Sequence, residues 1–157
     1  MKDSYALITG ASSGIGLEIA KNLAKRGYNL ILTARRTELL ESLSKEITNE
    51  NNINVDIISK DLSQYEAPKE IFEFCESKNY RVDILVNNAG YGIKTSFHET
   101  SIEDEEAFIR VLGTSVIMLT KLFVPKMLEN GGGKIMIVSS VASLTPPSAI
   151  PPLYGPI

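Results

Sequence analysis

The stretch Thr9-Gly10-Ala11-Ser12-Ser13-Gly14-Ile15-Gly16 decides how this chain folds. An apolar run at residues 5–9 precedes it and a helical pattern follows, so its glycines lie where a strand turns into a helix. Glycines at such a turn let the backbone approach a pyrophosphate, and the free N–H groups at the start of the helix bind the anion. A tight turn that binds no ligand is the alternative interpretation. The pattern predicts a dinucleotide-binding turn formed by Thr9, Gly10, Ser12, Ser13, Gly14, Ile15 and Gly16.

Short apolar runs and longer helical patterns alternate along the rest of the chain. The apolar runs predict strands at residues 5–9, 30–33, 53–58, 84–87 and 134–139. The helical patterns predict helices at residues 14–26, 36–50 and 66–78, and a long one from 102 toward 130. This order predicts parallel strands joined by helical crossovers. We therefore expect a single α/β domain over residues 1–157, a doubly wound parallel sheet of about five strands.

Two of the helical patterns have further features. In the helix predicted at residues 14–26, Ile15, Ile19 and Leu23 recur every four residues. The long helix opens on capping-box spacing at residues 100–104. Its apolar residues between Phe108 and Phe123 exceed what one buried stripe requires. This excess predicts a possible homo-oligomer that associates through the long helix.

Composition and charge exclude several classes of protein. The 157 residues carry 16 basic and 19 acidic side chains, a net charge of −3, which argues against nucleic-acid binding. One cysteine and one histidine rule out an internal disulfide framework and argue against a zinc site, so we expect no metal. We find neither an 18-residue apolar run nor the apolar core of a signal peptide. A cytoplasmic protein without a membrane span is therefore expected.

The residues after the second predicted strand bear on the choice of dinucleotide. Domains that prefer NAD usually place Asp or Glu there to bind the ribose 2′-OH. This chain has Arg35 and Arg36 instead, with no acidic residue before Glu38. A guanidinium binds a 2′-phosphate through two parallel hydrogen bonds, whereas a carboxylate repels it. We expect NADP rather than NAD, with both arginines as phosphate contacts; for either one, capping the next helix or facing solvent is the alternative.

The motifs, in this order, resemble those of the short-chain dehydrogenase/reductase family over essentially the whole chain. The glycine turn is similar to the cofactor turn of that family, and Asn87-Asn88-Ala89-Gly90 resembles its second motif. The resemblance implies a Rossmann fold that binds NAD or NADP. It also implies hydride transfer between the nicotinamide and a small-molecule alcohol or carbonyl substrate. The further cofactor contacts that it implies are Asp61 and Leu62, similar to the adenine-contacting pair, and Asn88, Ala89 and Gly90.

The resemblance also implies two catalytic residues. Ser140 stands where the family keeps the hydroxyl that positions the substrate oxygen, with Ser139 and Ser143 as weaker candidates. Tyr154 stands where the acid–base tyrosine follows. Because a free tyrosine has a pKa of about 10, it needs a positive charge nearby to work at neutral pH. In the family, a lysine four residues after the tyrosine supplies that charge.

Two departures from the family pattern bear on activity. The lysine would fall immediately after Ile157, and the strands, helix and substrate loop that the family places later would follow it. We therefore expect a member truncated at its C-terminus, whose substrate the sequence does not specify. Leu112 stands thirteen residues before Pro125, where the family usually carries an asparagine that supports the lysine. The alternative function is an inactive NADP-binding fragment or a regulatory nucleotide-binding module.

Overall fold

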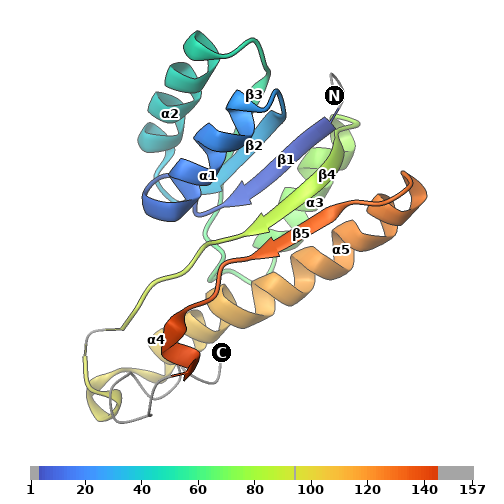
Figure 1. Cartoon of the computed structure of the whole chain (residues 1–157). Helices are drawn as coiled ribbons and strands as arrows, with labels where there is room; N and C mark the ends of the chain where they lie inside the picture. Colours follow the sequence, from blue (N-terminus) through green and yellow to red (C-terminus); the bar gives the residue numbers. More distant parts are fainter. Residues whose placement is uncertain (1–3, 94, 145–157) are drawn as a thin grey trace.

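Residues 4–93 and 95–144, which the computed structural model describes, contain five parallel strands in the order β3-β2-β1-β4-β5 (Figure 1). From β1 the chain adds β2 and β3 on one side, and it then crosses back to place β4 and β5 on the other side. Sheets of this kind bind ligands at the carboxyl ends of the strands where the direction changes, here β1 and β4. The predicted α/β fold with a doubly wound parallel sheet is confirmed. The strands are β1 (Ser4–Thr9), β2 (Asn29–Ala34), β3 (Val55–Ser59), β4 (Arg81–Asn87) and β5 (Lys134–Ile137).

Helices cover both faces of the sheet. Figure 1 shows α1 and α2 on one face and α3 and α5 on the other, while α4 lies beyond the carboxyl ends of the strands. The bounds of the strands and of the first three helices agree with the predicted ones to within three residues, and the largest difference is the start of β4, three residues before the predicted one. The helices are α1 (Gly14–Lys25), α2 (Thr37–Glu50), α3 (Ala67–Ser77), α4 (Ile102–Ile109) and α5 (Ser115–Glu129), with short turns η1 (Phe97–Glu99), η2 (Arg110–Thr114) and η3 (Val141–Leu144).

The central strand β1 is buried on both faces. Ala6 and Ile8 belong to the apolar cluster under α1 and α2, and Leu7 belongs to the cluster under α3 and α5. All three side chains are fully buried. The continuous apolar runs therefore correctly predicted strands that are covered by helices on both faces.

The fully buried face of α1 consists of small residues. Gly16, Ala20 and Ala24 are buried against the sheet. Small side chains let the helix backbone lie close to β1 at the glycine turn. Of the apolar repeat, Ile19 and Leu23 are partly buried and pack against the same cluster, whereas Ile15 is 61% exposed.

The long predicted helix is present but is interrupted in the middle. Ser101 caps its start, because the Ser101 hydroxyl accepts a hydrogen bond from the Asp104 backbone N–H at 3.1 Å. Between α4 and α5 the chain makes one π-helical turn, η2. The buried Ser115 hydroxyl donates to the Val111 carbonyl at 2.8 Å within this turn. Such π-helical turns are common at functional sites.

The stretch Ile102–Glu129 is also long and apolar enough to cross a membrane, judged by length and composition alone and within the described residues. The stretch contains Lys121 and Lys126 and so is not an uninterrupted apolar run, and the absence of a membrane span stays a prediction. Core helices of soluble proteins pass the same test, and Leu119, Phe123 and Met127 of this stretch do pack under the sheet. Only 28% of the apolar window is buried, and Ile117 and Leu128 are exposed. Association of two copies through this helix stays a prediction.

The close approach of α1 to the sheet limits the size of the side chains on its buried face. Replacing Ala20→Leu should lower the free energy of unfolding by about 1–3 kcal/mol, because the added atoms have no space against the sheet. Glu18→Leu, on the exposed side of the same helix, should change it by less than about 0.5 kcal/mol. Urea unfolding followed by circular dichroism measures both. Equal stability of the two variants would contradict this packing.

Candidate functional site

The glycine turn has the backbone geometry that the sequence predicts. Gly10 and Gly14 have φ angles of +66° and +59°, in the left-handed region that favours glycine. A Cβ atom on Gly16 would lie 2.4 Å from Asn88 Nδ2 and 2.5 Å from the Gly10 carbonyl oxygen. At Gly14 a Cβ atom would meet nothing within 4 Å. Gly10 and Gly16 therefore allow close packing of the turn, and Gly14 borders open space at the first turn of α1.

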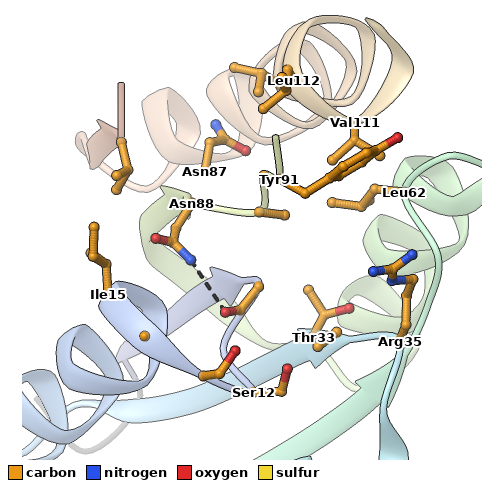
Figure 2. A pocket seen from close by; sticks show the side chains of 18 of the residues that line it. Ser12, Ile15, Thr33, Arg35, Leu62, Asn87, Asn88, Tyr91, Val111 and Leu112 are labelled. Atoms are coloured by element: carbon orange, nitrogen blue, oxygen red, sulfur yellow. Dashed lines mark hydrogen bonds between the residues drawn. The ribbon is translucent and has the colours of Figure 1, made fainter. Parts of the chain in front are cut away.

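Thr9 and Asn88 join the glycine turn to the end of β4. The Thr9 hydroxyl accepts hydrogen bonds from the backbone N–H groups of Asn88 and Ala89, at 2.9 and 3.0 Å, and donates to the Val86 carbonyl at 3.2 Å. In return, Asn88 Nδ2 donates to the carbonyl oxygens of Thr9 at 2.9 Å and of Gly10 at 3.3 Å. Figure 2 draws one hydrogen bond from Asn88 to the glycine turn as a dashed line. The two sequence motifs thus form one hydrogen-bonded unit, 79 residues apart along the chain.

A cleft of about 630 Å³ opens beside this unit, at the carboxyl ends of the strands. Thr9 and Gly16 do not line it and instead support the turn from behind. Tyr154 lies outside the described residues. The roles of Tyr154 and of the other predicted site residues stay predictions. The structure places the remaining predicted residues together around this cleft. Those that line the cleft are Gly10, Ser12, Ser13, Gly14, Ile15, Arg35, Arg36, Asp61, Leu62, Asn88, Ala89, Gly90 and Ser140.

One end of the cleft carries basic side chains. Arg36 Nη2 donates to the hydroxyl oxygens of Ser12 at 3.1 Å and Ser13 at 3.0 Å, so the guanidinium reaches across from β2 to the glycine turn. Arg35 and Lys60 line the same cleft. The Arg36 side chain therefore contacts the predicted phosphate-binding turn, although Arg36 is also the residue at the N-cap of α2.

Two buried oxygen atoms in the cleft wall have no hydrogen-bond partner among the described residues. They are Thr33 Oγ1, at the end of β2, and Asn87 Oδ1, at the end of β4. A buried polar group without a partner costs about 1–3 kcal/mol, so these two atoms are unfavourably placed within the described structure. The open glycine turn and the basic end of the cleft fit a phosphate-containing dinucleotide.

The side of the cleft formed by the long helix is apolar. Val111 and Leu112 of η2 line it, and Leu112 Cδ2 would lie 2.9 Å from a Cβ atom on Gly90. The position where the resemblance implies an asparagine thus packs a hydrocarbon side chain against the Asn-Asn-Ala-Gly motif. The sequence analysis missed Tyr91, which lines the same cleft. Its position directly after that motif was the available signal.

Ser140 lies in the cleft just beyond the end of β5. Its hydroxyl oxygen accepts a hydrogen bond from the Ala142 backbone N–H at 3.1 Å. The neighbouring Ser139 also lines the cleft. The structure thus brings the predicted catalytic serine, from beyond the edge strand β5, into the same cleft as the glycine turn that follows the central strand β1.

Comparison with known proteins identifies the family. The short chain dehydrogenase family matches residues 4–155. The chain belongs to this family. It is 35% identical over 133 residues to a very-long-chain 3-oxoacyl-CoA reductase of Vanderwaltozyma polyspora, which covers 80% of this chain and 37% of the reductase. The resemblance inferred from the motifs is thereby confirmed.

Solved short-chain dehydrogenases have the same fold. A short-chain dehydrogenase from Sphingobium yanoikuyae, in complex with NADPH, matches with a TM-score of 0.90 and 30% identity, covering 98% of this chain and 59% of that one. An L-sorbose reductase from Gluconobacter frateurii, with NADPH and L-sorbose, matches with a TM-score of 0.89 and 31% identity, covering 99% and 60%. The chain thus spans between about a third and two thirds of the length of these relatives.

The hydrogen bonds of Thr9 can be tested against a matched neighbour. Thr9 and Thr33 are register partners on β1 and β2, and both are buried. Replacing Thr9→Val should lower the free energy of unfolding by about 1–3 kcal/mol, because two backbone N–H groups lose their acceptor. Thr33→Val removes a hydroxyl oxygen that has no hydrogen-bond partner within residues 4–93 and 95–144, so it should leave stability unchanged or raise it. Chemical unfolding without nucleotide compares them, and equal losses would contradict the assignment.

Proposed function

We propose that this chain binds NADP(H) and serves hydride transfer between that cofactor and a small alcohol or carbonyl substrate. The observation that carries the proposal is the basic end of the cleft, where Arg36 is hydrogen-bonded to Ser12 and Ser13 beside Arg35. A pair of guanidiniums next to the phosphate-binding turn suits a 2′-phosphate. The family uses NAD or NADP, and the Sphingobium and Gluconobacter relatives hold NADPH, which supports the choice.

The cofactor roles follow from the arrangement of the cleft. The glycine turn and the start of α1 receive the pyrophosphate, and Arg35 and Arg36 receive the 2′-phosphate. Asp61 and Leu62 lie at the end of β3 on the same side of the cleft as the arginines, where the adenine belongs. One oxygen of the Asp61 carboxylate already has a partner, since Asp61 Oδ1 accepts a hydrogen bond from the Ser63 backbone N–H at 3.0 Å.

The chemistry needs a hydride carrier, a proton donor and a group that holds the carbonyl. The bound nicotinamide supplies or accepts the hydride. The Ser140 hydroxyl donates a hydrogen bond to the substrate oxygen, which gains negative charge during reduction. Tyr154 gives its phenolic proton to that oxygen as the alcohol forms and takes it back in the oxidation.

A second candidate function is nucleotide binding without catalysis. Leu112 favours it, because an apolar side chain packed on Gly90 offers no polar group at the position where the resemblance implies an asparagine. In this case the chain would bind NADPH through the same residues and would not consume it. The two candidates share the cofactor site and differ only in turnover.

One experiment separates the two candidates. The 157-residue protein is titrated with NADPH, and NADPH oxidation is then followed at its absorbance with aldehydes, ketones, sugars and a 3-oxoacyl thioester, the last two chosen from the relatives' names. Saturable binding with turnover supports the oxidoreductase. Binding without turnover of any substrate supports the second candidate. A protein that folds but does not bind NADPH overturns both.

The basic end of the cleft should decide between the two dinucleotides. Replacing Arg36→Ala should weaken NADPH binding about tenfold or more and change NADH binding much less, because hydrogen bonds to charged groups contribute about 1.5–3 kcal/mol. Arg26→Ala, an exposed arginine at the far end of α1, is the matched control and should change neither. Isothermal titration calorimetry measures the four affinities. An equal loss for NADPH and NADH would remove Arg36 as the 2′-phosphate contact.

Ser140 and Ser139 offer a second comparison if turnover is found. Replacing Ser140→Ala should lower kcat about 100-fold or more with little change in NADPH affinity, because it removes a donor to the developing oxyanion. Replacing Ser139→Ala should change kcat by less than a few fold. Steady-state kinetics with the best substrate of the panel measures both. A larger loss at Ser139 would reassign the catalytic serine to that position.

A further inference from the structure

Tyr91 is an aromatic side chain in the cleft with no role in the function proposed above. It follows the Asn-Asn-Ala-Gly motif directly and is 37% exposed. Figure 2 shows the side chain directed toward the end of the cleft where Leu62 and Arg35 lie. A large ring on the wall of a ligand cleft is a costly surface to leave in water, unless it meets an apolar or aromatic partner.

A buried neighbour fixes the Tyr91 ring. Phe108 of α4 is almost fully buried, and the two rings meet edge to face, with centroids 5.4 Å apart and an angle of 81° between their planes. This is one of the favoured geometries for an aromatic pair. The contact with the buried Phe108 therefore fixes the orientation of the Tyr91 ring, and part of the ring stays exposed in the cleft.

The neighbouring cleft residues place the ring at the adenosine end. Tyr91 lines the same cleft as Arg35 and Asp61, and Figure 2 shows Leu62 and Arg35 on the side of the cleft where the Tyr91 ring lies. Burial raises the pKa of Tyr91, the Arg35 guanidinium opposes that rise, and Asp104 and Asp61 add to it. The 2′-phosphate that Arg35 and Arg36 would bind is on the adenosine ribose, so the adenine is its immediate neighbour.

We propose that Tyr91 recognises the purine base of the dinucleotide by stacking its ring on the adenine, opposite the apolar side chain of Leu62. The inference rests on the proposed function, because it places the base from the phosphate contacts. Both side chains line the cleft, and a stack on the fixed ring would strengthen binding of any ligand that carries adenine. Tyr91 is thereby a residue for base recognition and has no part in hydride transfer.

The test compares three replacements of Tyr91 with 2′,5′-ADP and NADPH as ligands. Tyr91→Phe keeps the ring, Tyr91→Leu keeps apolar volume without a ring, and Tyr91→Ala removes both. Tyr65→Ala removes an exposed tyrosine that does not line the cleft and serves as the control. Calorimetry gives the dissociation constants, and thermal unfolding checks that each variant is folded.

We expect the dissociation constants of the Tyr91→Phe variant and of the Tyr65→Ala control to lie within about twofold of those of the natural chain. Leu and Ala should bind both ligands about 5- to 150-fold more weakly, the range found for base stacking on aromatic side chains. A Leu variant that binds as well as the Phe variant would overturn stacking, because it would show that only apolar volume matters. Failure of the natural chain to bind either ligand would instead overturn the proposed function, and the base assignment with it.

Discussion

The site depends on the hydrogen bonds that tie the end of β1 to the end of β4. A single hydroxyl, that of Thr9, accepts from two consecutive backbone N–H groups, while Asn88 Nδ2 returns two bonds to the carbonyls of the glycine turn. This network fixes how closely the turn approaches the neighbouring strand, and Gly10 and Gly16 are required because a Cβ atom on either would collide with it. The shape of the glycine turn is therefore determined by a contact between segments far apart in the sequence.

The electrostatic character of the cleft follows from the same arrangement. Once the turn is fixed, its two serine hydroxyls lie within hydrogen-bond distance of Arg36, which comes from the end of the adjacent strand. A net negative chain thus concentrates basic side chains at one end of a cleft whose helix side is apolar. Such a division suits a ligand with phosphate at one end and flat aromatic rings along its length.

The sequence was sufficient for the order of the elements and for most of the cleft, because strand burial and the glycine turn are local signals. It was insufficient where tertiary distance decides. Ile15 is exposed although it belongs to the apolar repeat of α1, and the small Ala20 is fully buried, since the close approach of α1 to the sheet selects small residues. The π turn at Arg110–Thr114 left no periodic signal, and the serine partners of Arg36 depend on the two strand ends meeting. Tyr91 is a similar case, because its ring lies in the cleft only after β4 and α4 are placed.

Support for the cleft differs between its two sides. The strands that carry the glycine turn and Thr33 are buried on both faces, whereas each of the four residues of β5 is exposed, with Ile137 at 56%. Ser140 follows this exposed strand and is held locally, by the backbone N–H of Ala142. The residues predicted to contact a dinucleotide therefore lie mainly at the ends of buried strands, whereas the predicted catalytic Ser140 lies beyond β5. Because local stability follows burial, the predicted cofactor contacts belong to the better-packed part of the described structure.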